Sequence, residues 1–372
     1  MRSAIPESNR LDFIQSLRGI AAVLVLLFHV TGNTLYHFKH APFLGWFEFG
    51  EVGVPIFFVI SGFIIFHAHR RDLGDPGKLP RYLWRRATRI YPAFWIANAA
   101  MCLLYLVRPQ FADDPRIMEP AMVAASFALL PTGIDPPLAV AWTLQYEILF
   151  YVAFSCGILH RRLGSIAVAV IGVPALATYL LKEFPARYQP PVLDVLFSPL
   201  QVLFGLGILA HYLQTRTRDA STPGATRWRN LAAWLALVLA LIGAAHVNRY
   251  GNLMKAGYVG VSFLFGIATA TLIACGPGTA ITRVLGKSRL WVFLGNASYS
   301  IYLVHSPIIS AFMKVGQKLP LDAPWKVEAY GWFTALGALA LSTLFSLAVE
   351  QPLQNLSRRI WDRFHPESKG SK

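Results

Sequence analysis

An arginine and a histidine share the first apolar stretch of this 372-residue chain. Arg18 and His29 are eleven residues apart, so a helix would bring them within about 20° of one face, with about 16 Å of rise between them. Ionisable side chains inside a membrane span cost about 2.5–3.5 kcal/mol on insertion scales and mark functional sites by default. A lone histidine is more often a hydrogen-bonded structural residue, but alignment with an arginine favours a functional imidazole, which would supply acid–base chemistry.

One acidic residue falls in the middle of an apolar stretch. It is Glu147, in AWTLQYEILFY, and a carboxylate beside a histidine can stay charged and orient the imidazole. We therefore predict that Glu147 is the partner of His29; the alternative is a structural hydrogen bond between helices. A second acid, Glu350, ends the last apolar stretch, where a basic side chain can reach it, and we interpret it as structural.

Two further stretches place polar groups among apolar ones. In LGNASYSIYLVHSPII, Ser298, Tyr302 and His305 follow the spacing i, i+4, i+7 and share one helical face. In GVPIFFVISGFII, Ser61 and Gly62 could loosen a helix or allow close approach of another backbone or a ligand. These groups either line a pocket or hold helices together.

A basic segment, HAHRRDLGDPGKLPRYLWRRATRIYP, precedes the third long apolar stretch. Arg81, Arg85 and Arg89 recur at i, i+4, i+8 after Pro80, so a short helix would gather them on one face, with Arg86 beside them. Guanidinium groups bind phosphates bidentately, which favours a cytoplasmic ligand with several phosphates. The alternative is a solvated loop that touches lipid head groups.

The composition explains where such residues must lie. The chain is 55% hydrophobic and 14% charged, with a mean hydropathy of +0.46, whereas a soluble domain is about 25% charged. These values indicate an integral membrane protein and exclude a nucleic-acid-binding protein, despite the net charge of +15. Cys102, Cys156 and Cys275 lack the paired spacing of a zinc site or a disulfide framework, and no metal site is predicted.

The fold class follows from apolar stretches of about 20 residues. We predict an all-α polytopic membrane protein of about ten transmembrane helices, near 12–31, 50–68, 90–107, 137–159, 165–182, 193–213, 230–247, 257–275, 290–313 and 327–349. The segment 119–133 is too short to cross and is predicted to be re-entrant or interfacial.

Lysine and arginine then give the orientation. With these spans, most of the 34 basic residues fall in the segments on the N-terminal side of the membrane. The positive-inside rule therefore predicts that both termini are cytoplasmic, which requires an even number of spans. Residues 1–350 form the predicted membrane domain and 351–372 a short basic cytoplasmic tail.

Taken in order, these motifs resemble the acyltransferase-3 family of membrane O-acyltransferases. SLRGIAAVLVLLFHV is similar to its first-helix signature, FFVISGFII to its second-helix signature and RRATR to its arginine motif. WTLQYEILFY, which begins at Trp142, is similar to its tryptophan and glutamate motif, and SYSIYLVHSPI to its late-helix motif. The resemblance covers nearly the whole chain and is closest to the stand-alone members that modify exopolysaccharides.

The resemblance implies transfer of an acyl group, usually acetyl from acetyl-CoA, to a hydroxyl of a cell-envelope glycan or its lipid-linked precursor. The reaction would take place in a bacterial cytoplasmic membrane, with acyl-CoA as donor substrate and no tightly bound cofactor. Arg85, Arg86 and Arg89 would hold the coenzyme A phosphates. His29 would act as general base or receive the acyl group, with Arg18 and Glu147 as the other catalytic residues. The substrate pocket would contain Ser61, Trp142, Ser298, Tyr302 and His305.

A transporter or flippase for a lipid-linked glycan is the alternative. Ten spans, buried polar residues and glycine or proline interruptions are compatible with it. Against it, the two halves show no pair of similarly broken helices, which an inverted-repeat transporter would show. No feature of the sequence indicates an oligomeric state.

Overall fold

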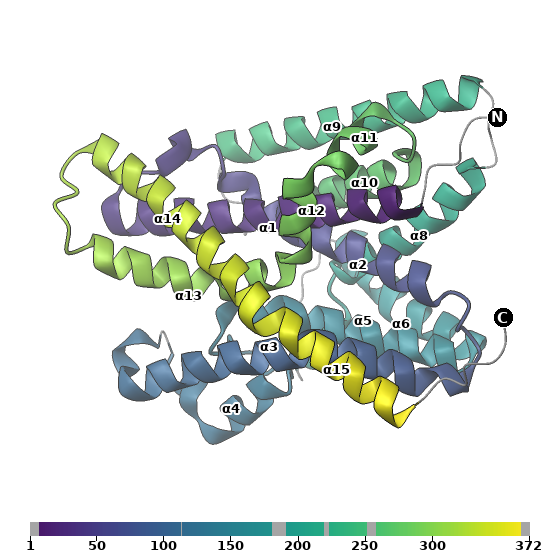
Figure 1. The fold of residues 1–372 in the computed structure, drawn as a ribbon, viewed down its shortest axis with the longest axis horizontal. Helices are drawn as coiled ribbons and strands as arrows, with labels where there is room; N and C mark the ends of the chain where they lie inside the picture. Colours follow the sequence, from purple (N-terminus) through teal and green to yellow (C-terminus); the bar gives the residue numbers. More distant parts are fainter. Residues whose placement is uncertain (1–6, 113, 181–190, 219–222, 251–257, 366–372) are drawn as a thin grey trace.

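The computed structural model describes residues 7–112, 114–180, 191–218, 223–250 and 258–365. These residues form helices and connecting turns, with no strand among them. The helices that build the bundle in Figure 1 are α1 (Glu7–Phe38), α2 (Gly53–His69), α3 (Leu79–Val107), α5 (Trp142–Leu159), α6 (Arg161–Leu180), α8 (Gln201–Arg218), α9 (Pro223–Tyr250), α10 (Tyr258–Cys275), α11 (Ala280–Lys287), α12 (Arg289–Asn296), α13 (Ser298–Gly316), α14 (Pro324–Phe345) and α15 (Gln351–Phe364).

The prediction of an all-helical, multi-pass membrane protein is confirmed. Among the described residues, eight helices are long and apolar enough to cross a membrane, or nine if α10 and α11, bent by 92°, make one span. The predicted ninth span, 290–313, is instead two helices that break at Ala297. The second of them, α13, has 19 residues and a length of about 28 Å. It is less apolar than the eight helices above because it contains serine, tyrosine and histidine, and most of these side chains are buried in the bundle.

Helix α1 lies at the centre of one half of the bundle and packs against α2, α12, α13 and α14. Glycine permits the closest of these crossings. A Cβ atom on Gly295 would overlap the carbonyl oxygen of Gln15, and one on Gly19 would overlap that of Trp291. Small residues at such crossings let two backbones meet inside a membrane. The sequence places Gly295 just before the polar face of α13, so this crossing positions that face against α1.

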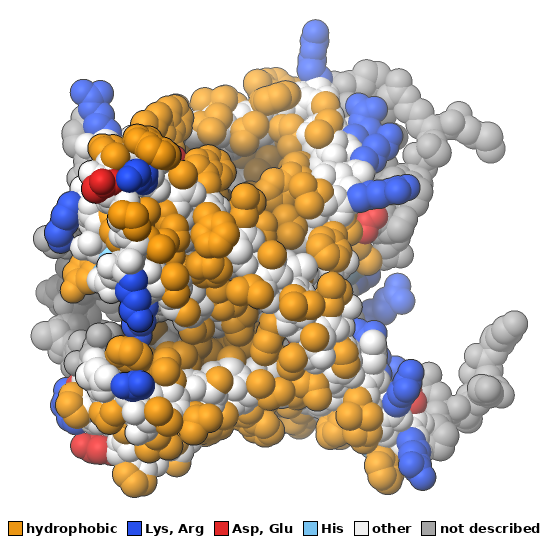
Figure 2. Space-filling model, turned by 60° about the vertical axis from the view of Figure 1, so that its left-hand side comes forward, with side chains coloured by type: hydrophobic (Ala, Val, Ile, Leu, Met, Phe, Trp, Pro, Cys, Tyr) orange, Lys and Arg blue, Asp and Glu red, His pale blue; other side chains and the backbone are white. Residues whose placement is uncertain are grey.

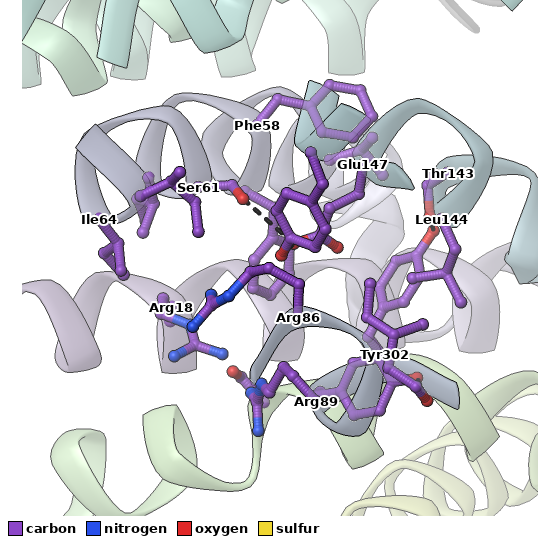
Figure 3. Close-up of a pocket in the computed structure, with 18 residues that line it drawn as sticks. Arg18, Phe58, Ser61, Ile64, Arg86, Arg89, Thr143, Leu144, Glu147 and Tyr302 are labelled. Atoms are coloured by element: carbon purple, nitrogen blue, oxygen red, sulfur yellow. Dashed lines mark hydrogen bonds between the residues drawn. The ribbon is translucent and has the colours of Figure 1, made fainter. Parts of the chain in front are cut away.

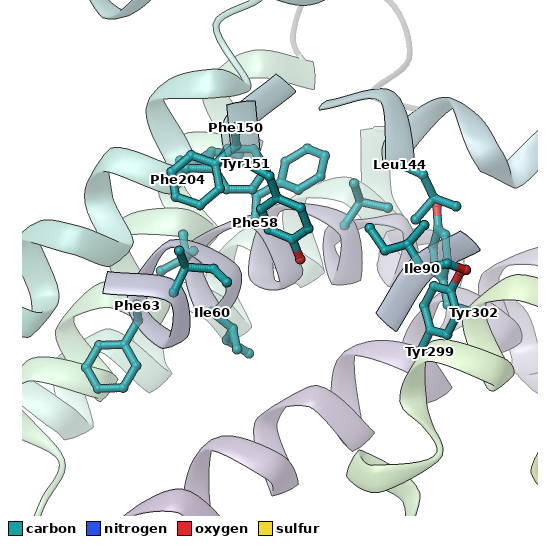
Figure 4. Close-up of a cluster of buried hydrophobic side chains, with 14 of the residues drawn as sticks. Phe58, Ile60, Phe63, Ile90, Leu144, Phe150, Tyr151, Phe204, Tyr299 and Tyr302 are labelled. Atoms are coloured by element: carbon teal, nitrogen blue, oxygen red, sulfur yellow. The ribbon is translucent and has the colours of Figure 1, made fainter. Parts of the chain in front are cut away.

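Three aromatic rings join α2, α5 and α8 in the largest buried cluster (Figure 4). The ring of Phe204 stacks on Phe58 at 4.8 Å and on Phe150 at 4.5 Å. Gly62 lies beside this cluster, where a Cβ atom would overlap the carbonyl oxygen of Phe204. The Gly62 position therefore serves close helix packing between α2 and α8 rather than a loosened helix.

The arginine segment does not form a separate short helix. It is the first part of α3, which begins at Leu79 with proline in its first turn and runs without interruption to Val107. The predicted tail also begins as helix, because a π-helical turn, Ser346–Glu350, joins α14 to α15. Trp84 of α3 donates from Nε1 to the Ser357 carbonyl of α15 at 3.2 Å. Residues 366–372 of the predicted tail lie outside the described residues.

The segment predicted to be re-entrant or interfacial contains one short helix, α4 (Pro120–Phe127). Eight residues span about 12 Å, less than half of the hydrocarbon core. Trp95 and Asn98 of α3 hold α4 through hydrogen bonds to the Phe127 carbonyl and to Ser126. The prediction that this segment does not cross is confirmed.

On the face drawn in Figure 2, a broad apolar band lies between two opposite edges that carry lysine and arginine. Such a band is what a bilayer requires of the lipid-facing surface. The start of α1 and the end of α15 lie at the same end of the bundle (Figure 1).

Candidate active site

Two histidines from distant parts of the chain meet in the bundle. His29 of α1 and His305 of α13 approach to 3.2 Å between Nδ1 and Nε2, respectively. His305 is fully buried and His29 is partly buried. Since the helical break at Ala297 and the Gly295 crossing set the direction of α13, those features bring the two rings together.

The hydrogen bonds of the histidine pair determine where its protons lie. Nδ1 of His305 is 3.0 Å from the Ile301 carbonyl and 2.7 Å from the Tyr302 carbonyl, so this nitrogen must carry hydrogen. Nε2 of neutral His305 then accepts, and Nδ1 of His29, which also lies 2.9 Å from the Val25 carbonyl, donates. In this tautomer Nε2 of His29 bears a free lone pair.

That nitrogen is also free of protein partners. Within the described part of the chain, Nε2 of His29 makes no hydrogen bond. An unprotonated imidazole nitrogen without a protein partner is equipped to remove a proton or to attack an electrophilic carbon.

A separate cavity of about 120 Å³ lies between α1, α2, α3, α5 and α13 (Figure 3); its walls are mainly apolar, and it is here called the polar cavity for the four charged side chains that it contains. Arg18, Arg86 and Arg89 gather their guanidinium groups on one side of it. The opposite wall includes Glu147 and Tyr302. Three cations and one carboxylate leave the cavity positively charged, which suits an anionic ligand.

Tyr302 separates this cavity from the histidine pair. Its ring lies 5.8 Å from that of His305, while its hydroxyl group is held 2.9 Å from Oγ1 of Thr143 on α5. Tyr302 thus lines the cavity and packs against His305 at the same time. The two polar regions are neighbours along α13.

The predicted pairing of Glu147 with His29 is wrong. Glu147 accepts a hydrogen bond from the Ser61 hydroxyl at 3.1 Å and another from the Tyr151 hydroxyl, while His305 takes the place beside His29. The reason lies in helix packing: α5 contacts α2 and α3, whereas α12, α13 and α14 surround the opposite side of α1. The alternative, a hydrogen bond between helices, is what Glu147 makes with Ser61.

Glu350 has the structural role that we predicted. Its carboxylate, 1% exposed, lies 2.5 Å from the Arg89 guanidinium and accepts hydrogen bonds from Ser300, Ser346 and Gln354. The π-helical turn that ends at Glu350 directs this carboxylate into the bundle. Arg89 is therefore held in place at the edge of the cavity.

Beyond Arg86 and Arg89, α3 and α15 enclose an open groove of about 920 Å³, here called the basic groove. It is lined by Arg81, Trp84, Arg85, Arg86, Thr88, Arg89, Gln354, Arg358, Trp361, Asp362 and His365. Five of these residues are arginines and one is acidic. Because Arg86 and Arg89 line both spaces, the basic groove and the polar cavity adjoin at these two side chains.

The structure brings most of the predicted site residues together. The polar cavity contains Arg18, Ser61, Arg86, Arg89, Glu147, Ser298 and Tyr302, whereas Arg85 lines only the basic groove. Trp142 lies outside the cavity, with its ring 5.8 Å from that of Tyr146, and His305 lies beside His29.

Sequence reasoning missed three residues of this site. The Tyr151 hydroxyl donates a hydrogen bond to Glu147, which lies one turn earlier in α5. Their i, i+4 spacing is visible in the sequence. Tyr299 donates to the Ile90 carbonyl at 2.7 Å, and its ring lies 5.2 Å from the Arg89 guanidinium. Arg358 comes from the predicted tail, and only the packing of α15 on α3 brings it to the groove.

The chain is similar in sequence to known proteins over most of its length. The chain is 28% identical over 348 residues to the exopolysaccharide production protein ExoZ of Rhizobium meliloti, covering 90% of this chain and 96% of that protein. It is 25% identical to acyltransferase MdmB of Streptomyces mycarofaciens, covering 97% and 95%, and 22% identical to O-acetyltransferase OatA of Staphylococcus aureus, covering 80% and 50%. No solved structure matches the chain.

A family model described as an acyltransferase domain matches residues 11–350. This range includes the histidine pair, the polar cavity and Glu350, but not α15. The match extends over most of the chain, and two of the relatives are named acyltransferase and O-acetyltransferase. The chain therefore belongs to the acyltransferase-3 family of membrane proteins and is an O-acyltransferase.

Proposed function

We propose that this protein transfers an acetyl group from acetyl-CoA to a hydroxyl of a cell-envelope or extracellular polysaccharide or of its lipid-linked precursor. The names of its relatives ExoZ and OatA support the polysaccharide and the acetyl group. We further propose that the membrane is the bacterial cytoplasmic membrane and that the end of the bundle with the basic groove faces the cytoplasm.

The basic groove is the proposed site of the coenzyme A nucleotide. Coenzyme A carries a pyrophosphate and a 3′-phosphate, and arginine is the side chain best suited to bind phosphate oxygens in pairs. Arg85 and Arg358 approach the groove from α3 and α15, so a ligand between these helices would meet charge from both sides. Trp84 and Trp361, whose rings lie 5.9 Å apart, offer stacking surfaces for the adenine.

The polar cavity is the proposed path of the acyl-pantetheine arm. It adjoins the basic groove at Arg86 and Arg89 and ends at Tyr302, next to the histidine pair. The arm is uncharged except at its phosphate end, so the arginines hold that end while the thioester moves toward α13. A cavity of about 120 Å³ must widen to admit the arm, because it holds only a few water molecules.

His29 performs the proposed chemistry. Its Nε2 atom removes the proton of the acceptor hydroxyl, the oxygen forms a bond to the thioester carbonyl carbon, and the carbon–sulfur bond breaks. The proton passes from His29 to the departing thiolate, which restores the neutral imidazole. The same lone pair serves a two-step route in which Nε2 first receives the acetyl group. His305 and the Val25 carbonyl hold His29 in the tautomer that both routes need.

The observation that carries this proposal is the basic groove that leads to the polar cavity beside the histidine pair. Purified protein in nanodiscs is incubated with radiolabelled acetyl-CoA and the surface polysaccharide of its host. Label in the polysaccharide, lost in His29→Ala, is the expected result. Polysaccharide labelled equally by His29→Ala would overturn the role of His29, and unlabelled polysaccharide with the intact protein would overturn the reaction.

Donor binding has its own test. Titration of coenzyme A by calorimetry is expected to show about tenfold weaker binding to Arg85→Gln, which corresponds to about 1.4 kcal/mol. Arg283→Gln is the matched control, because Arg283 is an exposed arginine of α11 outside the groove. Equal affinities for both variants would place the nucleotide elsewhere. The family assignment leaves the transporter alternative without support.

A further inference from the structure

A second large space lies away from the active site, between α5, α6 and α8 and the end of α2; it is here called the lateral groove. Its volume is about 960 Å³, at the upper end of the range of about 300–1,000 Å³ for ligand pockets. Its walls are mainly apolar and include Phe154, Val168, Leu176 and Leu209. Val168, Leu176 and Leu209 are also exposed on the surface of the described chain, so the groove opens toward lipid.

Glycine shapes this groove in two ways. Gly157 and Gly164 bring the backbones of α5 and α6 together, since a Cβ atom on Gly164 would overlap the Cα atom of Gly157. Gly172 of α6 and Gly205 of α8 line the groove, and a Cβ atom on either would have no neighbour within 4 Å. Protein interiors are close-packed, so a gap of this size between helices calls for an occupant.

One end of the groove is positively charged. Arg70, at the end of α2, and Arg161, at the start of α6, both line it, and no aspartate or glutamate does. Arg161 donates from Nε to the Leu73 carbonyl at 3.1 Å, and Arg70 donates to the His67 carbonyl. These bonds anchor each side chain, and neither arginine forms an ion pair within the described ranges. Both guanidinium groups retain N–H donors for a ligand.

We propose that the lateral groove binds one anionic glycerophospholipid of the surrounding membrane. Its phosphate lies on Arg70 and Arg161, and its acyl chains lie along the apolar walls of α6 and α8. Basic pockets between transmembrane helices bind anionic lipid head groups, and arginine binds phosphate bidentately. A zwitterionic lipid is disfavoured because its ammonium group would find no carboxylate among the lining residues.

The test uses the whole chain in nanodiscs that contain equal amounts of phosphatidylglycerol and phosphatidylethanolamine. Native mass spectrometry after release from the discs reports which lipid stays bound. The intact protein is expected to retain one phosphatidylglycerol at least fivefold more often than phosphatidylethanolamine. Gly205→Leu fills the groove and is expected to lose it. Gly260→Leu is the control, because its Cβ atom also meets nothing within 4 Å but lies outside the groove.

The arginine pair is tested separately. The double variant Arg70→Gln/Arg161→Gln is expected to lose the preference for phosphatidylglycerol, while Arg283→Gln retains it. Equal retention of the two lipids by the intact protein would overturn the proposal, as would retention by Gly205→Leu equal to that by Gly260→Leu. A lipid-free dimer mass would indicate that a second copy covers the groove and would also overturn it. None of these readouts depends on acetyl transfer, so their outcome does not test the proposed function.

Discussion

His29 and His305 are joined by a 3.2 Å contact between Nδ1 of the first and Nε2 of the second, across 276 residues of chain. Carbonyl groups fix the proton on Nδ1 of His305, so its Nε2 atom is an acceptor, and this atom and the Val25 carbonyl together favour hydrogen on Nδ1 of His29. The His305 imidazole thus orients His29, as a carboxylate orients the histidine of a serine protease triad, without placing a further charge in the membrane.

The histidine pair predicts strongly non-additive kinetics. His29→Ala is expected to lower kcat by about 10²–10⁴, the usual contribution of a positioned base. His305→Ala is expected to lower kcat by about 10², because Nδ1 of His29 then keeps only the Val25 carbonyl as acceptor and the ring is held less firmly in the productive orientation and tautomer. The double variant is expected to be no slower than His29→Ala, as measured by acetyl transfer at saturating donor. Multiplication of the two losses would show that His305 acts independently of His29.

Glu147 is expected to act separately from that pair. Its carboxylate contacts Ser61 and Tyr151 in the polar cavity, so its loss changes the donor path and not the tautomer of His29. The rate losses of Glu147→Gln and His305→Ala should therefore multiply in the double variant. Ser61→Ala, which removes one hydrogen bond to the same carboxylate, serves as the milder comparison. A double variant no slower than either single variant would restore the pairing that the sequence favoured.

Glu350 is expected to contribute mainly to stability. Its buried carboxylate pairs with Arg89 and accepts hydrogen bonds from three further side chains. Without it these donors have no acceptor and the Arg89 charge has no partner, which lowers the free energy of unfolding by about 3–5 kcal/mol. Glu350→Ala should melt at a markedly lower temperature in detergent, as followed by fluorescence-detected size exclusion after heating.

The matched control for this carboxylate is Asp322, whose ion pair with Lys326 lies on the surface. Asp322→Asn should leave the melting temperature unchanged, because exposed ion pairs contribute little. Equal melting temperatures for Glu350→Ala and Asp322→Asn would contradict the structural role of Glu350.

The helix crossing at Gly295 makes a prediction about folding. A methyl group at this position would overlap the Gln15 carbonyl of α1, and overpacking of this kind costs about 1–3 kcal/mol. Gly295→Ala should reduce the yield of monodisperse protein and displace α13, together with the histidine pair. Gly172→Ala, where the added Cβ meets nothing within 4 Å, should leave the yield unchanged. Comparable yields for both variants would argue against a tight crossing.

Helix α15 predicts that the end of the chain takes part in donor binding. Arg358 is exposed and acts at the groove mainly through charge, so Arg358→Gln should raise KM for acetyl-CoA by about three- to tenfold with kcat unchanged. The difference should shrink at high salt, as screening predicts. An unchanged KM at low salt would confine donor binding to α3.

The sequence predicted the class of this protein because hydropathy and motif order are local properties. A low charged fraction and long apolar stretches require helices in a membrane, whatever their arrangement. Helical spacing also grouped residues correctly within single helices, as for the arginines of α3 and for Tyr302 and His305 of α13. The short length of segment 119–133 likewise predicted that it does not cross the membrane.

Tertiary structure alone decided which of these faces meet. The sequence favoured Glu147 as the partner of His29 because a carboxylate can orient an imidazole, but the spacing of one helix contains no information about its neighbours. The choice depended on the break at Ala297, the glycine crossing of α12 over α1, and the packing of α5 on the other side. The same holds for α15, which the sequence predicted to be a basic tail. Contacts of two tryptophans and the ion pair of Glu350 place this helix against α3. Periodicity fixes the direction of a side chain about its own axis, whereas packing against other helices determines what that side chain touches.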